Sequence, residues 1–227
     1  MSFIKELKKP DNIIDFTLFD VSDENEWVNL SVCLENKGFY PDLLINCAGV
    51  LPKFSSFENI EINDFKKVLD VNLFSCVYST KHLLPLLKKC EYPIVINVSS
   101  SASLVTFAGI SSYATSKSAL KSFSMCLSSE MGKRGHVGCI CPGFTSTDIF
   151  RNQDGDAKDF RLIKRLSTSP EKVAKKTVKA ITKRKKLKVI GYDAKLMNFF
   201  YKLAPNLTAC IITKILKKSG LKLFKDV

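Results

Sequence analysis

Short apolar runs alternate along this chain with longer segments of helical periodicity, and this alternation limits the folds open to it. Each run is closed by Asp, Asn, Ser, Gly or Pro. We predict strands over 13–19, 42–46, 93–98, 137–141 and 187–190. Near-continuous apolar strands indicate burial on both faces of a sheet, which is typical of parallel pairing. The pattern therefore predicts an α/β protein built on a parallel sheet.

The segments between these runs have the spacing of amphipathic helices. Asp23 suits the N-cap of a helix that ends at Lys37, and Gly132 suits the stop of a helix over 112–131. Further helices are predicted over 63–89 and 170–183. Strands that alternate with helices form right-handed βαβ units, so we predict a Rossmann-like doubly wound sheet.

Composition fits one globular domain in a reducing compartment. The 227 residues are 45% hydrophobic and 25% charged, which suffices for a large core. The eight Cys form no CxxC pair and no ligand cluster with His82 or His136. We therefore expect free thiols, no metal site and a cytoplasmic location. The start lacks a secretory signal, and no stretch reaches the ~20 apolar residues that span a bilayer.

The chain is strongly basic, with a formal charge of +13. Lysine and arginine cluster in 172–176 and 183–186. We interpret both clusters as solvated helix faces and expect no nucleic-acid partner, although anionic lipid is an open alternative.

Polar or small residues stand at the carboxyl ends of the predicted strands, where ligands bind in parallel sheets. Tyr113 and Lys117 lie four positions apart, so a helix places their phenol and ammonium on one face. Ser100 closes a strand thirteen residues upstream of Tyr113. These three side chains form a proton-transfer group suited to hydride chemistry on a carbonyl or an alcohol.

Five motifs, in this order and spacing, resemble those of the classical short-chain dehydrogenase/reductase family. They extend from about Asp20 to Thr147 and comprise Asn46-Cys47-Ala48-Gly49 (the family has Asn-Asn-Ala-Gly), Asp70-Val71-Asn72, Asn97-Val98-Ser99-Ser100, Tyr113 with Lys117, and Pro142 to Thr147. The resemblance implies an oxidoreductase that interconverts an alcohol and a carbonyl. It also implies NAD or NADP as the cofactor, and we expect NADP to be slightly favoured.

The resemblance implies a role for each matching residue. Tyr113 would be the general acid and base, with its pKa lowered by the Lys117 cation one turn away. Lys117 would also bind the nicotinamide ribose, and Ser100 would hydrogen-bond the substrate oxygen. Asn72 would hold a water that connects Lys117 to solvent. The remaining cofactor contacts would be Asp20 and Val21 at the adenine, Asn46, Ala48 and Gly49 along the cofactor, and Pro142, Gly143, Thr145 and Thr147 at the nicotinamide amide.

The Gly-rich turn that should precede Asp20 is not found. Sheets of this kind begin with a strand, such a turn and a helix that together cradle the pyrophosphate. The nineteen residues before Asp20 contain no Gly, and 5–10 resemble the end of the family's second helix. We therefore expect an N-terminally truncated fold that lacks its first βαβ unit, on the order of 30 residues.

A start codon placed too far downstream, a fragment or splice form, and a degenerate non-catalytic protein would each explain this gap. The intact catalytic positions favour the first. We also expect 12–19 either to pair with the strand at 42–46 or to lie as a poorly supported sheet edge.

The C-terminal part predicts a helical extension, so we divide the chain into a core over 1–191 and an extension over 192–227 that packs on it. Residues 194–204 and 206–218 form amphipathic patterns separated by Pro205. We prefer a cover for the substrate pocket or a subunit contact, and a membrane-interface anchor is the alternative. An apolar lid suggests a hydrophobic carbonyl substrate.

The sequence also bears on the assembly of the chain and on alternatives to an enzyme. Ala114, Ser118 and Ser122 share a helix face that permits close packing, and the family assembles through the helices matching 63–89 and 112–131, so we expect a homo-oligomer. The rivals to an enzyme are a non-catalytic interaction protein and a peripheral membrane protein that uses the basic tail.

Overall fold

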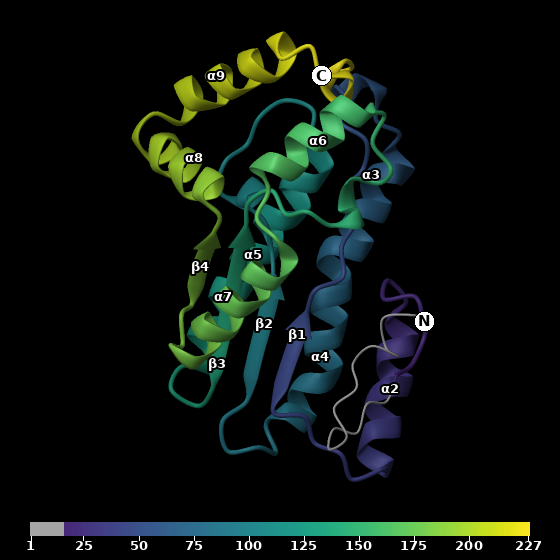
Figure 1. Ribbon diagram of the computed structural model, residues 1–227. Coiled ribbons are helices and arrows are strands. Elements are labelled where there is room, and N and C mark those ends of the chain that lie inside the picture. Colours follow the sequence, from purple (N-terminus) through teal and green to yellow (C-terminus); the bar gives the residue numbers. More distant parts are fainter. Residues whose placement is uncertain (1–15) are drawn as a thin grey trace.

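The computed structural model describes residues 16–227 and contains a parallel sheet (Figure 1). Its strands are β1 (Leu43–Asn46), β2 (Ile94–Val98), β3 (His136–Pro142) and β4 (Leu187–Ile190), in the order β1-β2-β3-β4. Every neighbouring pair is parallel, and Asn46, Asn97, Cys139 and Leu187 lie in one row across the sheet. The predicted α/β fold is confirmed.

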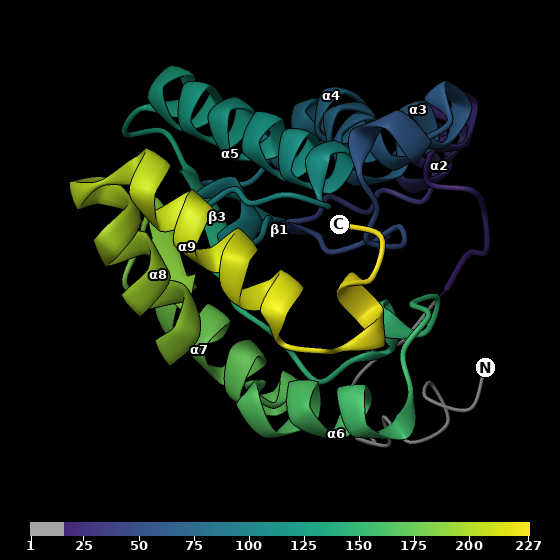
Figure 2. The same ribbon diagram turned by 90° about the horizontal axis from the view of Figure 1, so that it is seen from above.

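Helices cover both faces of the sheet, as Figure 2 shows from above. One layer contains α2 (Glu24–Asn36), α3 (Ile62–Leu69), α4 (Ser75–Leu87) and α5 (Ser111–Met131). The opposite side carries α6 (Ala157–Leu166) and α7 (Pro170–Thr182). The helices α8 (Tyr192–Leu203) and α9 (Pro205–Lys218) follow β4 and lie at the end of the sheet to which the strands point.

The ends of several helices follow their sequence signals. The Asp23 carboxylate accepts the Asn25 N–H at 2.9 Å and caps α2. Gly132 ends α5 with a φ of 58°, a left-handed conformation that glycine adopts without steric cost. Pro205 separates α8 from α9 by standing at the first position of α9, where its missing N–H costs nothing.

The helix predicted over 63–89 is wrong in its middle. The chain forms α3, then the π-helical turn η2 (Asp70–Phe74), then α4. A π turn adds one residue to a single helical turn, so apolar spacing alone does not reveal it. The insertion buries Asn72 completely.

The strand predicted over 13–19 is also wrong for the residues that the structure describes. Residues 16–19 have no strand conformation, and 12–15 lie outside the described residues. Phe19 packs edge-on against Trp27 of α2, with ring centroids 5.0 Å apart, while Leu18 is 79% exposed. The segment thus contacts α2 through an aromatic pair.

The helix α6 was not predicted, although its N-terminus carries a recognisable signal. The Asp156 carboxylate accepts the N–H of Asp159 at 3.0 Å, and Asp159 accepts the N–H of Asp156 in return, which forms a capping box. None of the helices described between residues 16 and 227 combines the length and apolar character needed to cross a bilayer.

Candidate active site

A cavity of about 820 Å³ opens where the strands end, and most of the predicted catalytic residues line it. Ser100 reaches it from the end of β2, and Tyr113 and Lys117 reach it from the first two turns of α5. The segment after β3 closes another wall through Pro142, Gly143, Thr145 and Thr147. The topology therefore assembles side chains that are dispersed over about fifty residues of sequence.

Lys117 is a buried cation at the base of this cavity. Its side chain is 3% exposed, and Nζ donates to the Val98 carbonyl at 3.1 Å. Among the residues that the structure describes, no carboxylate lies within ion-pair distance of this Nζ. Burial lowers the pKa of Lys117 because water no longer solvates the ammonium.

Gly49 lies against Lys117 and has no side chain to interfere with it. A Cβ atom at Gly49 would lie 3.2 Å from Lys117 Nζ and 3.2 Å from Asn72 Oδ1. This glycine therefore allows the chain after β1 to pass close to the lysine, which leaves space on the cavity side for a bound group.

Tyr113 and Ser100 form the second polar element of the site. Burial raises the pKa of the Tyr113 phenol, and a side-chain hydrogen bond with Ser100 offsets part of that rise. Lys117 Nζ lies 6.0 Å from the centroid of the Tyr113 ring. The raised pKa of Tyr113 differs from the lowering expected from Lys117, because desolvation of the phenol is the largest effect.

Ser100 is held in place by the short turn that follows β2. Its Oγ accepts the Ala102 N–H at 3.2 Å and caps η3 (Ser101–Ser103), and its carbonyl accepts Ser103 Oγ–H at 2.6 Å. The neighbouring Ser99 Oγ donates to the Lys117 carbonyl at 2.8 Å. The end of β2 and the second turn of α5 are thus fixed to each other.

Asn72 positions the loop after β1 and does not line the cavity. Its Oδ1 accepts the Val50 N–H at 2.7 Å, and its Nδ2 donates to the Val50 carbonyl at 2.9 Å and to Ser116 Oγ at 3.0 Å. Its carboxamide atoms are thus engaged with protein groups. The side chain itself acts as a clamp between the loop and α5.

Asn46 and Ala48 also lie outside the cavity lining. Asn46 is buried, donates to Asn97 Oδ1 at 2.8 Å and accepts Ser79 Oγ–H at 2.7 Å. This network joins β1, β2 and α4, so the Asn46 side chain has a structural task. Ala48 is exposed on the loop, and its neighbours Cys47 and Gly49 are the residues of this motif that line the cavity.

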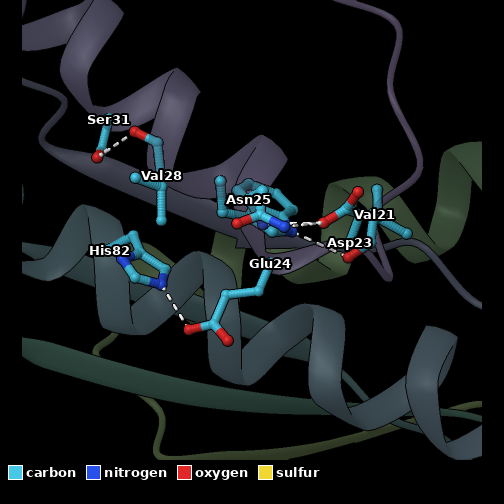
Figure 3. Close-up of polar contacts among 8 residues, drawn as sticks. Val21, Asp23, Glu24, Asn25, Val28, Ser31 and His82 are labelled. Atoms are coloured by element: carbon cyan, nitrogen blue, oxygen red, sulfur yellow. Dashed lines mark hydrogen bonds and ion pairs between the residues drawn. The ribbon is translucent and has the colours of Figure 1, made fainter.

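Asp20 and Val21 are not brought to the cavity either. Asp20 accepts the N–H of Ser22 at 2.9 Å and its Oγ–H at 2.6 Å, and these bonds lower the pKa of the exposed Asp20 carboxyl. The Val21 carbonyl accepts the Trp27 indole N–H at 2.9 Å. Figure 3 shows Val21 beside the N-terminus of α2, where Glu24 pairs with His82 of α4 at 2.9 Å.

The segment after β3 is anchored by a residue that the motifs did not indicate. Asp193, in the first turn of α8, accepts the Phe144 N–H at 2.9 Å and lies where a Gly143 side chain would be. Thr145 Oγ1 donates to the Gly143 carbonyl at 3.1 Å. Only a glycine at 143 admits this carboxylate so close to the backbone. Asp193 has no short-range sequence signal, because it is fifty residues away from Gly143.

The apolar wall of the cavity was the other feature missed by sequence reasoning. It is formed by side chains from six separate segments, among them Leu51, Phe54, Ile110, Phe150, Val173 and Met197. The C-terminal turn supports this wall, since Phe224 stacks on Phe54 at 4.8 Å and Val227 contacts Gly109. Apolar residues in loops are not distinguishable from core residues by pattern alone.

The polar groups of the site suit an organic cofactor. Among the described residues, no three His, Cys, Asp or Glu side chains gather in a way that would hold a metal ion. Gly49, Lys117 and Gly143 line the cavity, where the absence of side chains at the two glycines exposes the backbone to a bound group. Such a group would be held by Lys117 and by the segment from Pro142 to Thr147.

The family model described as short chain dehydrogenase matches residues 2–158. This chain belongs to the short-chain dehydrogenase family. Members of that family are oxidoreductases. The alignment includes the Ser100, Tyr113 and Lys117 positions that meet in the cavity.

Individual relatives agree with this assignment. The chain is 35% identical over 157 residues to dehydrogenase/reductase SDR family member 9 of Bos taurus, covering 66% of this chain and 47% of the relative. It is 30% identical over 207 residues to a fatty acyl-CoA reductase of Acinetobacter baylyi, covering 90% and 66%. A short-chain dehydrogenase structure from Streptomyces avermitilis superposes with a TM-score of 0.73 at 21% identity, covering 96% and 83%.

The chain spans about half the length of the first curated relatives that it matches. Solved neighbours with TM-scores of 0.65 and 0.68 contain NADH in one case and NADP in another. At 23% and 17% identity, these two show the shared fold.

Proposed function

We propose that this protein interconverts an alcohol and a carbonyl on a hydrophobic substrate, with NAD or NADP as cofactor and NADP slightly favoured. The observation that carries the proposal is the convergence of Ser100, Tyr113 and Lys117 on one end of an apolar cavity of about 820 Å³. The bound cofactor would supply or accept a hydride.

Tyr113 is the group suited to move the proton. During reduction its hydroxyl would give a proton to the carbonyl oxygen, and during oxidation its phenolate would take one from the alcohol. Burial raises the pKa of Tyr113, so the phenol is protonated at neutral pH, which is the form that donates a proton during reduction. The Ser100 hydroxyl, bonded to the same phenol, would orient the substrate oxygen and stabilise charge that develops there.

Lys117 would bind the cofactor ribose and adjust the charge around Tyr113. Its Nζ uses one of three donors on the Val98 carbonyl, which leaves two for a ligand. Gly49 and Gly143 would let the ligand approach the backbone, and Thr145 and Thr147 would offer hydroxyls at the nicotinamide amide. Asn72, whose side chain positions the loop, would hold a water that connects Lys117 to solvent.

The apolar wall supports a hydrophobic substrate class. Leu51, Phe54, Ile110 and Phe150 line the cavity and belong to the same apolar cluster as Tyr113, and their side chains offer no hydrogen bond to a polyhydroxylated substrate. Burial of an alkyl chain against such a wall would contribute about 0.8 kcal/mol for each CH₂ group.

A turnover panel tests this proposal. Oxidation of NADH or NADPH would be followed with a series of aliphatic ketones and aldehydes of increasing length and with open-chain sugars as polar controls. We expect turnover that rises with chain length, and none with the sugars. Equal rates for sugars and long ketones would refute the hydrophobic class, and the absence of cofactor binding would instead favour a non-catalytic interaction protein.

We also propose that residues 192–227 pack as an extension on the core of 1–191. The hydrogen bond between Tyr201 Oη and Thr106 Oγ1 at 2.9 Å and the Ala108 N–H bond to Thr213 Oγ1 at 3.2 Å support this division. A homo-oligomer through α4 and α5 remains our proposal, supported by Ser118 and Ser122 on the outer part of α5. The cysteine spacing in the sequence supports a cytoplasmic location.

A further inference from the structure

The helices α8 and α9 expose an apolar stripe on the side that faces away from the protein. In α8 the exposed apolar residues recur at helical spacing and form one face: Tyr192, Leu196, Phe199, Phe200 and Leu203. In α9 the same spacing places Leu207, Ile211 and Ile215 on one face. Leu203 is 69% exposed and Ile215 is 61% exposed, so nothing within residues 16–227 covers them.

The opposite faces of both helices are firmly packed. Ala194 is fully buried, Met197 lines the cavity and Tyr201 bonds to Thr106. In α9, Thr208 is buried and Leu216 packs against the apolar cluster around Tyr113. Contacts of their inward faces therefore fix both helices on the protein, and their apolar stripes remain exposed to solvent.

The exposed charged residues of α8 and α9 are all lysines: Lys195, Lys202, Lys214, Lys217 and Lys218. The one acidic residue of these two helices, Asp193, accepts the Phe144 N–H and is half-buried. All of the lysines within α8 and α9 are exposed. An apolar face bordered by cations matches a surface that combines hydrocarbon with negative charge.

We propose that the outer faces of α8 and α9 dock on a bilayer that contains anionic lipid. The exposed Leu, Ile and Phe side chains would enter the boundary between head groups and acyl chains, and the lysines would pair with lipid phosphates and carboxylates. A second copy of this chain fits the same face less well, because it would bring the five lysines of α8 and α9 against the same five lysines.

The docking face lies beside the cavity. Both helices occupy the end of the molecule to which the strands point (Figure 1), and Figure 2 shows α9 extending across that end. Met197 on α8 contributes to the cavity wall. If the proposed function holds, a lipophilic carbonyl would pass from the bilayer to Tyr113 without crossing bulk water. The docking itself does not depend on that activity.

Vesicle co-sedimentation of the full chain, without cofactor or substrate, tests the docking. The vesicles would be phosphatidylcholine alone or phosphatidylcholine mixed with phosphatidylserine. The test variant is Leu203→Glu with Ile215→Glu. Its matched control is Leu18→Glu with Ile62→Glu, which makes the same residue and charge changes at sites that are 79% and 59% exposed elsewhere. Circular dichroism confirms that both variants fold.

We expect binding to the mixed vesicles, a loss of roughly tenfold or more for each Glu introduced on α8 or α9, and wild-type binding for the control. Replacing Lys214, Lys217 and Lys218 by Gln should weaken binding to the mixed vesicles by up to about a hundredfold, since each lysine near an anionic surface contributes about fivefold. The same change at Lys172, Lys175 and Lys176 of α7 should have much less effect.

Two results would overturn the proposal. One is equal binding by the test and control variants. The other is no binding of the wild-type chain to the mixed vesicles. A molar mass by light scattering that then falls in the Leu203→Glu, Ile215→Glu variant would identify the face as a subunit contact. Because turnover plays no part in these measurements, their failure is separate from a failure of the proposed activity.

Discussion

The carboxamide of Asn72 pairs with both backbone groups of Val50, accepting its N–H at 2.7 Å and donating to its carbonyl at 2.9 Å. The Asn72 carboxamide thus satisfies both backbone groups of Val50, as a neighbouring strand would do in a sheet. Because η2 widens the helix at Asn72, the side chain reaches the loop from a fully buried position. The contact keeps Gly49 next to Lys117.

Asn72→Ala should lower the free energy of unfolding by about 2–3 kcal/mol, because it removes three hydrogen bonds, to Val50 and to Ser116 Oγ, from a fully buried position. Urea denaturation measures the change. Asn63→Ala, at an exposed position in α3, is the control and should change stability by less than ~1 kcal/mol. Equal losses in the two variants would mean that the Val50 contact contributes nothing.

The buried ammonium of Lys117 should lower the free energy of unfolding of the protein. Lys117→Met removes a buried ammonium and retains the shape of the stem, so we expect the free energy of unfolding at neutral pH to rise by about 1–2 kcal/mol after loss of the bond to Val98. Turnover should be abolished. Lys121→Met, which removes a similar bond to the Ser103 carbonyl at 2.8 Å, is the matched control and should not stabilise the protein.

The gain from Lys117→Met should depend on pH in a defined direction. Burial lowers the pKa of Lys117 below 10.5, so the unfolded chain binds the proton more tightly than the folded chain does. Wild-type stability therefore rises with pH between the folded pKa and 10.5, and the advantage of the methionine variant shrinks across the same window. Denaturation at a series of pH values measures this, and a constant advantage would contradict the assignment.

His136 should make the fold sensitive to acid. Its Nε2 is buried without a hydrogen-bond partner among the described residues, and desolvation, Arg184 and Lys186 lower its pKa from 6.5. As pH falls below 6.5, His136 becomes protonated in the unfolded chain but stays neutral in the folded chain. The free energy of unfolding therefore decreases by up to about 1.4 kcal/mol for each pH unit, until the pH reaches the pKa of His136 in the folded chain.

His136→Gln should remove this loss, as seen by thermal or urea unfolding between neutral and mildly acidic pH. His82→Gln, at the other histidine, serves as the comparison and should retain it. If the acid-side decrease persists unchanged in His136→Gln, the effect arises elsewhere.

Gly143 and Asp193 should be energetically coupled. Gly143→Ala would place a methyl group on the Asp193 carboxylate and should cost about 1–3 kcal/mol. In an Asp193→Ala background the same methyl group has space, so its cost should fall. A double-mutant cycle measures the interaction, and additive effects would show that the carboxylate is free to move aside.

The sequence alone predicted the parallel sheet and most helix limits because these depend on local signals. Asp23, Gly132 and Pro170 mark helix ends by their own backbone chemistry, and buried parallel strands are apolar throughout. The strand over 13–19 was predicted by the same apolar signal and is wrong for 16–19. A strand also needs a neighbour, and sequence pattern does not show whether one is available.

The site was predictable only where function demands particular residue types. Ser100, Tyr113, Lys117 and the segment from Pro142 to Thr147 meet in one cavity as expected. The side chains of Asn46 and Asn72 instead serve buried hydrogen-bond networks, and Asp193 and the apolar wall gave no signal. These features depend on contacts between distant segments, which only the folded chain defines.

The most direct test is steady-state turnover of a long-chain ketone by Tyr113→Phe, with Tyr78→Phe as the matched control. Tyr78 lies on α4 against Phe74 and is not among the cavity-lining residues, so its hydroxyl should be dispensable. We predict that kcat falls by about 10²–10⁴ in Tyr113→Phe and stays near wild type in Tyr78→Phe, because general acid catalysis contributes that factor. Equal rates for wild type and Tyr113→Phe would contradict the assignment of Tyr113 as the proton donor.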